Sequence, residues 1–184
     1  EILRFDRAGK PVPFQATGTN ALSVDPTMQV NFWHDVYHGM DVDRHGNIYY
    51  VAKVDVDSKQ RPVSAYDALR RQVNVYDADG NLQKNGLLRL DCVRGIQVDE
   101  AGSLYVVHRP ANRPWEDYLA LSKFPPSGGE PLWSRIWDGY FGWAQVANPP
   151  CHCTAFRLHQ ALDGKGYLYA AGKYSVQVIA CATG

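Results

Sequence analysis

The feature that most constrains the fold is an internal repeat of a short hairpin pattern. The segment GMDVDRHGNIYYVAK (39–53) is followed by GIQVDEAGSLYVVHR (95–109) and, in a reduced form, by QALDGKGYLYAAGK (160–173). In each copy apolar residues alternate on both sides of a turn that contains Asp and Gly. This pattern predicts a strand, a tight turn and a second strand.

A second hairpin pattern alternates with the first. Its copies are ILRFDRAGKPVPF (2–14), VNVYDADGNLQKN (73–85) and VQVIACATG (176–184), and LALSKFPPSGGEPLW (119–133) fills the same slot with a Pro-rich turn. The glycines of the first pattern, Gly46, Gly102 and Gly166, are 56 and 64 residues apart. A repeat of four short strands at this scale is typical of β-propeller blades.

The combined pattern G-Φ-x-V-D-x-x-G-x-Φ-Y-V, followed by V-x-V-Y/F-D-x-x-G, resembles the NHL-repeat propellers and the related gluconolactonase-type six-bladed propellers. The resemblance covers most of the chain and implies an all-β fold of four-stranded antiparallel blades. Within a single segment, 1–184, it gives a half blade (1–14), two blades (39–90 and 95–135) and a partial blade (153–184). We therefore expect a partial ring, completed by further chain or by another subunit.

Composition and charge exclude several classes of function. The 19 basic and 19 acidic residues cancel, and no segment gathers Lys and Arg as a nucleic-acid-binding stripe would require. No apolar run approaches the ~20 residues of a membrane span. The chain starts with Glu rather than Met, and we expect a processed protein or a piece of a longer one.

The four cysteines form an even number, which permits disulfides in an oxidising compartment. We therefore expect an extracytoplasmic protein, periplasmic or secreted, with free or metal-bound thiols in the cytosol as the alternative. Cys92 and the pair Cys151 and Cys153 each precede the first strand of a blade, so a disulfide across the blade interface is expected. The alternatives are a zinc site that adds His152 or His38 to these thiols, and cysteines that stay free.

Long connections are predicted on one face of the disc, at 15–38, 54–71, 109–117 and 136–152. Loops grouped on one side of a rigid scaffold commonly bind ligands or partners. These loops carry Trp33, His34, Trp115 and Trp143, which are candidate partner-binding residues. The alternative is that their rings only pack the loops onto the disc.

Two further candidates stand where a blade begins. His38 and Arg94 each precede the glycine that opens a first strand, so both side chains are expected near the mouth of the central channel and are candidate ligand-binding residues. The alternative is that they bond only water or backbone. His34 and His38 have HxxxH spacing, but the HExxH zinc motif is not present. The recurring aspartates are expected to cap turns rather than to catalyse, and they are Asp6, Asp43, Asp77, Asp99 and Asp163.

No GxSxG, P-loop or GxGxxG motif occurs, so the sequence does not indicate a serine hydrolase or a nucleotide-binding protein. The sequence favours a non-catalytic, NHL-like propeller region of a larger exported protein, which binds a protein or ligand through its long-loop face and needs no cofactor. One alternative is a metal-dependent lactonase or amidating lyase with zinc or calcium in the channel, although the matching slots hold His38, Arg94 and Leu158. Another is a propeller that docks a redox partner.

Overall fold

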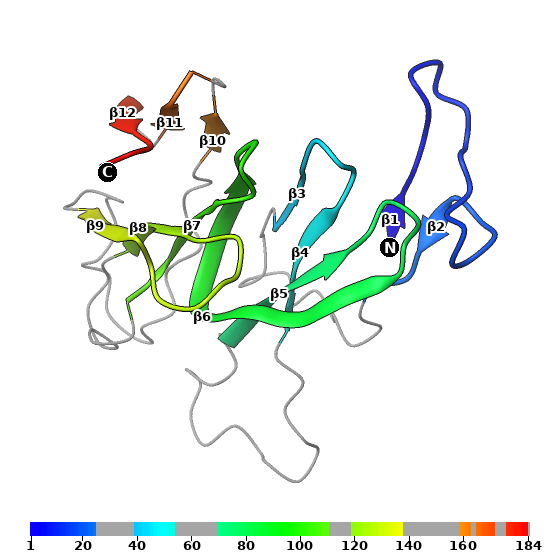
Figure 1. The fold of residues 1–184 in the computed structure, drawn as a ribbon, viewed down its shortest axis with the longest axis horizontal. Coiled ribbons are helices and arrows are strands. Elements are labelled where there is room, and N and C mark those ends of the chain that lie inside the picture. Colours follow the sequence, from blue (N-terminus) through cyan, green and yellow to red (C-terminus); the bar gives the residue numbers. More distant parts are fainter. Residues whose placement is uncertain are drawn as a thin grey trace, which may run out of the picture.

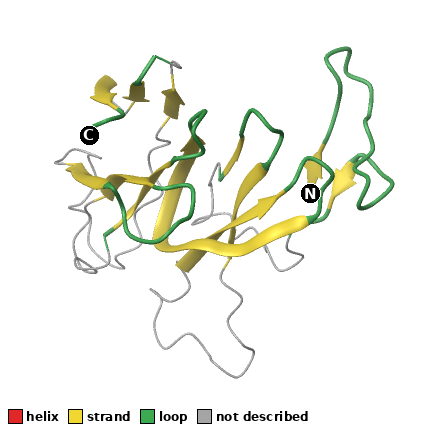
Figure 2. Ribbon diagram, in the orientation of Figure 1, coloured by secondary structure: helices red, strands yellow, loops and turns green. Residues whose placement is uncertain are grey.

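The computed structural model of the chain describes residues 1–24, 39–53, 70–110, 119–137, 159–162, 165–171 and 176–183. These residues form strands and turns, and Figure 2 shows no helix among them. In the described part of the chain, accordingly, no helix is long and apolar enough to cross a membrane. The strands are β1 (Ile2–Leu3), β2 (Ala21–Leu22), β3 (Met40–Val42), β4 (Ile48–Lys53), β5 (Arg70–Tyr76), β6 (Leu82–Val98), β7 (Leu104–Arg109), β8 (Leu119–Phe124), β9 (Trp133–Trp137), β10 (His159–Leu162), β11 (Tyr167–Ala171) and β12 (Val176–Ala180).

Within each sheet, strands that are neighbours in the sequence pair in antiparallel fashion. They form a two-stranded sheet (β1-β2), a seven-stranded sheet (β3-β4-β5-β6-β7-β8-β9) and a three-stranded sheet (β10-β11-β12). None of these sheets closes on itself. The prediction of an all-β protein built from antiparallel hairpins is therefore confirmed.

The hairpins form where the sequence repeats Asp-x-x-Gly. In the turn between β3 and β4, the Asp43 carboxylate accepts hydrogen bonds from the backbone N–H groups of His45 and Asn47, at 2.8 and 2.9 Å. Gly46 has a φ of +82°, a conformation that side chains with a Cβ rarely adopt, and its N–H donates to the Asp43 carbonyl at 3.0 Å. A short aspartate and a glycine at this spacing are thus sufficient to reverse the chain.

The same turn recurs three more times in the described residues. Asp6, Asp77 and Asp99 each accept two backbone hydrogen bonds through Oδ1, from the residues two and four positions later. The predicted capping role of these aspartates is confirmed, whereas Asp163 lies outside the described residues. Gly46, Gly102 and Gly166 all have positive φ and lie in turns between strands, as the repeat predicts.

Strand β6 belongs to two hairpins. Up to Asp91 it pairs with β5, and from Gly95 onward it pairs only with β7, with an irregular register between these two residues. Figure 1 shows that the strand changes direction along its length. The segments predicted as two separate blades, 39–90 and 95–135, are therefore hydrogen-bonded into one sheet. Only three residues separate Asp91 from Gly95, and they keep the backbone extended instead of forming a loop.

The strands fall into four units. The first unit is β1 and β2, the second is β3–β5 with β6 up to Asp91, the third is β6 from Gly95 with β7–β9, and the fourth is β10–β12. The units follow one another from the N-terminal side of the molecule to the C-terminal side (Figure 1).

Each hydrophobic core lies between two successive units. The first and second units share Ile2, Phe14, Leu22, Val24 and Ile48. The second and third share Tyr49, Val51, Val73, Val75, Leu88, Val93, Ile96, Val98, Leu104, Val106 and Phe124. The third and fourth share Tyr105, Val107, Leu121, Leu168, Ile179 and Cys181. Neighbouring residues on one strand, such as Leu104 and Tyr105, enter different cores because side chains alternate across a sheet.

Candidate functional site

The long connections leave the seven-stranded sheet at the strand ends that lie opposite the Asp–Gly turns. We call the strand ends that carry the Asp–Gly turns the turn edge, and there register pairs such as Val42 with Ile48 close the hairpins. At the opposite edge, Lys53 pairs with Arg71, and Leu119 pairs with Trp137. Asp91 on β6 pairs with both neighbouring strands at this edge, with Arg70 on β5 and with Arg109 on β7. We call this second edge the loop-side edge.

Most of the buried polar side chains in the described residues lie toward the loop-side edge. They are Arg71, Gln72, Asn74, His108, Arg109 and Ser122. Gln72 donates to the amide oxygens of Asn74 and Asn85, at 2.9 and 2.6 Å, and Asn74 accepts the N–H of Gly86 at 2.9 Å. This cluster of amide side chains supplies a hydrogen-bond acceptor for a backbone N–H group at the point where extra residues in β6 interrupt its pairing with β5.

A hydrogen-bonded chain runs across β7, β8 and β9. His108 Nδ1 lies 3.0 Å from the carbonyl oxygen of Arg109, and its Nε2 lies 2.8 Å from Ser122 Oγ. Because a carbonyl only accepts, Nδ1 carries the proton in the neutral ring, and Nε2 accepts from the Ser122 hydroxyl. Ser122 Oγ in turn lies 2.7 Å from Ser134 Oγ, and Ser134 is exposed. The chain thus links a buried imidazole to solvent.

Burial lowers the pKa of His108, although its hydrogen bond to the Arg109 carbonyl and the charge of Asp91 oppose this effect. The ring is therefore neutral near pH 7. Within the described residues, no group of three or more His, Cys, Asp or Glu side chains could hold a metal ion. The hydrogen-bonded chain of His108, Ser122 and Ser134 is able to pass a proton along its two hydroxyl groups. It also gives each of these three polar side chains a hydrogen-bond partner within the sheet.

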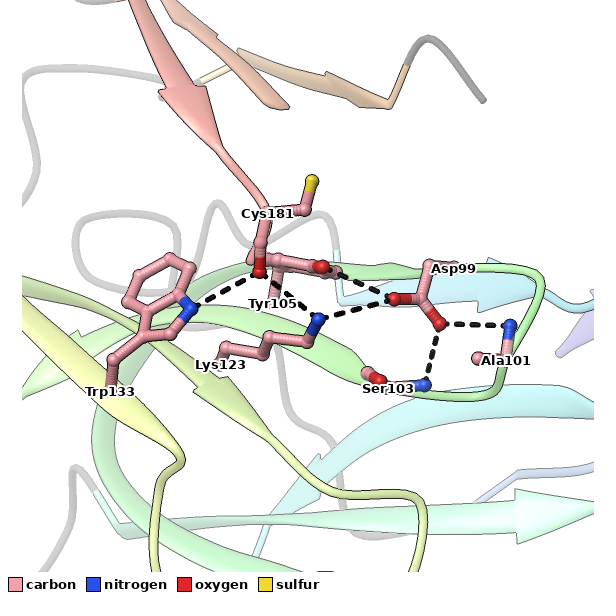
Figure 3. Close-up of polar contacts among 7 residues, drawn as sticks. All are labelled: Asp99, Ala101, Ser103, Tyr105, Lys123, Trp133 and Cys181. Carbon is pink, nitrogen blue, oxygen red and sulfur yellow. Dashed lines mark hydrogen bonds and ion pairs between the residues drawn. The ribbon is translucent and has the colours of Figure 1, made fainter. Parts of the chain in front are cut away.

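A second polar network lies at the turn edge, between the third and fourth units (Figure 3). Asp99 Oδ2 accepts a hydrogen bond from the Tyr105 hydroxyl at 3.1 Å and lies 3.7 Å from Lys123 Nζ. Lys123 Nζ also donates to the Cys181 carbonyl at 3.0 Å, and the Trp133 indole N–H donates to the same carbonyl at 3.2 Å. The network therefore joins β8 and β9 to the turn that follows β12.

Burial and neighbouring groups act on the Tyr105 hydroxyl in this network. Burial, the Cys181 thiol and the Asp99 carboxylate all raise the pKa of Tyr105, so its hydroxyl stays protonated and donates. Lys123 Nζ lies 5.2 Å from the centre of the Tyr105 ring, within cation–π range. Cys181 is buried and is a free cysteine. These contacts indicate a structural connection between sheets rather than a reactive site.

Most of the site residues predicted from the sequence lie outside the described residues. They are Trp33, His34, His38, Trp115, Trp143, Cys151, His152 and Cys153. Cys92 and Arg94 lie on β6, in its irregular part between Asp91 and Gly95, and their side chains are outside the described part. The proposed disulfide, the metal site and the aromatic binding surface therefore stay predictions.

The repeated pattern of the sequence predicts neither polar network. The signal for the first is a histidine at the end of an apolar strand, LYVVHR, because a polar residue in a buried strand needs a partner. The signal for the second is weaker, since Lys123 and Cys181 are far apart in the sequence. No family model matches this chain, and no curated protein matches it either.

Proposed function

We propose that this chain is a non-catalytic stretch of an NHL-like β-propeller within a larger exported protein, and that it binds a protein or ligand through its loop-side edge. The observation that carries the proposal is the separation of the two edges. Short capped turns occupy one edge, and the segments 54–69, 111–118 and 138–158 leave from the other.

Two contacts support the propeller part of the proposal. In such a fold the first strands of successive blades lie side by side around an axis. The Asp41 carboxylate on β3 accepts the backbone N–H of Val98 on β6 at 2.7 Å, so the first strands of the second and third units are adjacent. Strand β10, the first strand of the fourth unit, also contacts β6.

The chemistry of the two edges supports the choice of binding surface. At the turn edge the carboxylates are already occupied as hydrogen-bond acceptors. Asp43, Asp77 and Asp99 each accept hydrogen bonds from the backbone N–H groups of their own turn. The loop-side segments hold the candidates Trp115 and Trp143, and aromatic residues dominate binding energy at protein interfaces.

The test compares variants at the two edges. The triple variant Trp33→Ala, Trp115→Ala and Trp143→Ala is compared with a turn-edge control, Arg44→Ala with Glu100→Ala, whose residues are exposed. Immobilised proteins are exposed to an extract of the source cells, and retained proteins are quantified by mass spectrometry. A partner retained by the wild type and the control but lost by the triple variant supports the proposal.

Thermal unfolding is measured on the same samples. If the triple variant unfolds many degrees below the wild type, the rings are core residues and the binding proposal fails. Equal retention of every protein by the triple variant and the control also contradicts it.

A further inference from the structure

A surface hydroxyl of the third unit is connected to a buried imidazole through one intervening hydroxyl. His108 on β7 and Ser122 on β8 are 7% and 0% exposed, whereas Ser134 on β9 is exposed. His108 Nε2 lies 2.8 Å from Ser122 Oγ, and Ser122 Oγ lies 2.7 Å from Ser134 Oγ. The hydrogen-bonded chain therefore runs from the interior to solvent across three neighbouring strands.

The second imidazole nitrogen sets the direction of both hydrogen bonds. His108 Nδ1 donates to the Arg109 carbonyl oxygen at 3.0 Å, because a carbonyl only accepts. Nε2 of the neutral ring is then an acceptor, and it takes the single hydroxyl hydrogen of Ser122. Ser134 consequently donates its own hydrogen to Ser122 Oγ. With this hydrogen directed inward, Ser134 Oγ is oriented as a nucleophile.

Strand register holds the three side chains in place. Ser122 pairs directly with Ser134, and His108 pairs with Ala120, which is two residues from Ser122 on the same strand. Side chains two residues apart on a strand lie on the same face of the sheet. The His108 ring also contacts the Phe124 ring, with the ring centroids 5.7 Å apart. The base is thus fixed before any reagent arrives.

We propose that Ser134 is a modification site, at which Oγ accepts an acyl group from an aryl ester or a thioester. A hydroxyl is a weak nucleophile until a neighbouring base takes its proton. As Ser134 Oγ attacks the carbonyl carbon of the donor, Ser122 Oγ takes the proton of Ser134, and His108 Nε2 takes the proton of Ser122.

The same chain completes the reaction. Burial lowers the pKa of His108, so the imidazolium returns its proton through Ser122 to the leaving oxygen or sulfur. One C–O or C–S bond of the donor breaks, an ester forms on Ser134, and a phenol or a thiol is released. The chain supplies a nucleophile and a base, and this combination suits donors whose leaving groups are stable as anions.

This inference does not rest on the proposed function, because a single acylation requires no turnover and none of the candidate tryptophans. The probe is p-nitrophenyl acetate, added to the full chain at about pH 8, and tandem mass spectrometry follows acetylation at each serine over time. The internal control is Ser127, an exposed serine in the turn between β8 and β9, whose hydroxyl donates to the Gly128 carbonyl at 3.5 Å.

In the wild type we expect Ser134 to be acetylated at least about tenfold faster than Ser127, because a positioned base accelerates the attack. Equal rates at the two serines overturn the proposal, and this comparison requires no variant. His108→Gln and Ser122→Ala should each reduce the rate at Ser134 to about that at Ser127. An unchanged rate at Ser134 in a folded variant, as judged by circular dichroism, also overturns it.

The variant Ser134→Cys separates proton transfer from a structural role of His108. Part of an ordinary thiol is already thiolate at about pH 8, so the thiol requires no base. Adding His108→Gln should therefore leave acetylation of the Ser134→Cys variant at this position nearly unchanged, whereas the same change slows the native serine. If both nucleophiles are slowed to the same extent, the imidazole only maintains the local structure and the proposal fails.

Discussion

Arg4 and Lys123 make the same contact in two different parts of the molecule. Each lies two residues before the first residue of a turn that closes with the same backbone hydrogen bond, from Gly9 to Asp6 or from Gly128 to Pro125. Each donates a 3.0 Å hydrogen bond to a backbone carbonyl in the next unit, that of Ala78 or that of Cys181. The accepting residues are also equivalent, because both follow the first residue of the corresponding turn. A long cation therefore links one sheet to the turn of the next, in addition to the apolar core.

Replacing Lys123 by Met should weaken the connection between the third and fourth units. The change keeps the aliphatic stem but removes the donor to the Cys181 carbonyl and the ion pair with Asp99. We expect a loss of about 1–2 kcal/mol in the free energy of unfolding, measured by urea denaturation. Lys84→Met, at an exposed position on β6, is the control. Equal stability of the two variants would show that the bond to Cys181 contributes nothing.

Asp99→Ala should destabilise the protein more than Asp6→Ala. Both side chains accept two backbone hydrogen bonds in their turns, and loss of these bonds costs on the order of 1 kcal/mol. Asp99 also accepts the Tyr105 hydroxyl, which the substitution would leave without this acceptor. An additional loss of about 1 kcal/mol is expected for Asp99, and chemical denaturation of both variants measures it. Identical losses would contradict this role of Tyr105.

His108 should make stability depend on pH in the weakly acidic range. Because burial lowers the pKa of His108 below its ordinary value of 6.5, the unfolded chain binds the proton more readily than the folded protein does. Neutral His108 therefore makes its full contribution to the free energy of unfolding above pH 6.5. This contribution is lost as the pH falls toward the pKa of His108 in the folded protein.

Thermal unfolding between about pH 7.5 and about pH 5 checks this expectation. His108→Gln should show a smaller decrease in melting temperature over this range than the wild type, because glutamine does not titrate. His45→Gln, on an exposed turn, is the matched histidine control. If His108→Gln and the wild type lose stability in parallel, the imidazole is not responsible.

Adjacent glycines in the turn between β8 and β9 should respond differently to alanine. Gly128 and Gly129 both have positive φ, at +75° and +92°, so alanine strains either position by about 1–2 kcal/mol. A Cβ at Gly128 would also collide with the backbone carbonyl of Leu87, whereas a Cβ at Gly129 would meet nothing within 4 Å. We expect Gly128→Ala to be less stable than Gly129→Ala by about 1–3 kcal/mol in denaturant titrations. The reverse order would contradict this packing of the turn against β6.

The sequence by itself determined the hairpins, because their chemistry is local. An aspartate that caps the N–H groups two and four residues later, followed by a glycine at positive φ, reverses the chain without help from distant residues. The positions of the turns at Asp6, Asp43, Asp77 and Asp99, and the antiparallel pairing around them, could therefore be predicted. The aromatic and cysteine candidates could not be placed in this way, since they lie in connections without a repeated local pattern.

Only the tertiary structure decided how the equivalent positions are used. Whether Val75 is buried while Val178 is exposed depends on which sheet packs on each face, and side chains far away in the sequence make these contacts. The same holds for His108, whose partners on β8 and β9 follow from strand register, and for β6, whose two halves share one sheet because the few residues between them stay extended. Local turn chemistry determines the repeated hairpins. Whether a residue of the repeat is buried or exposed depends on which unit packs on its side of the sheet.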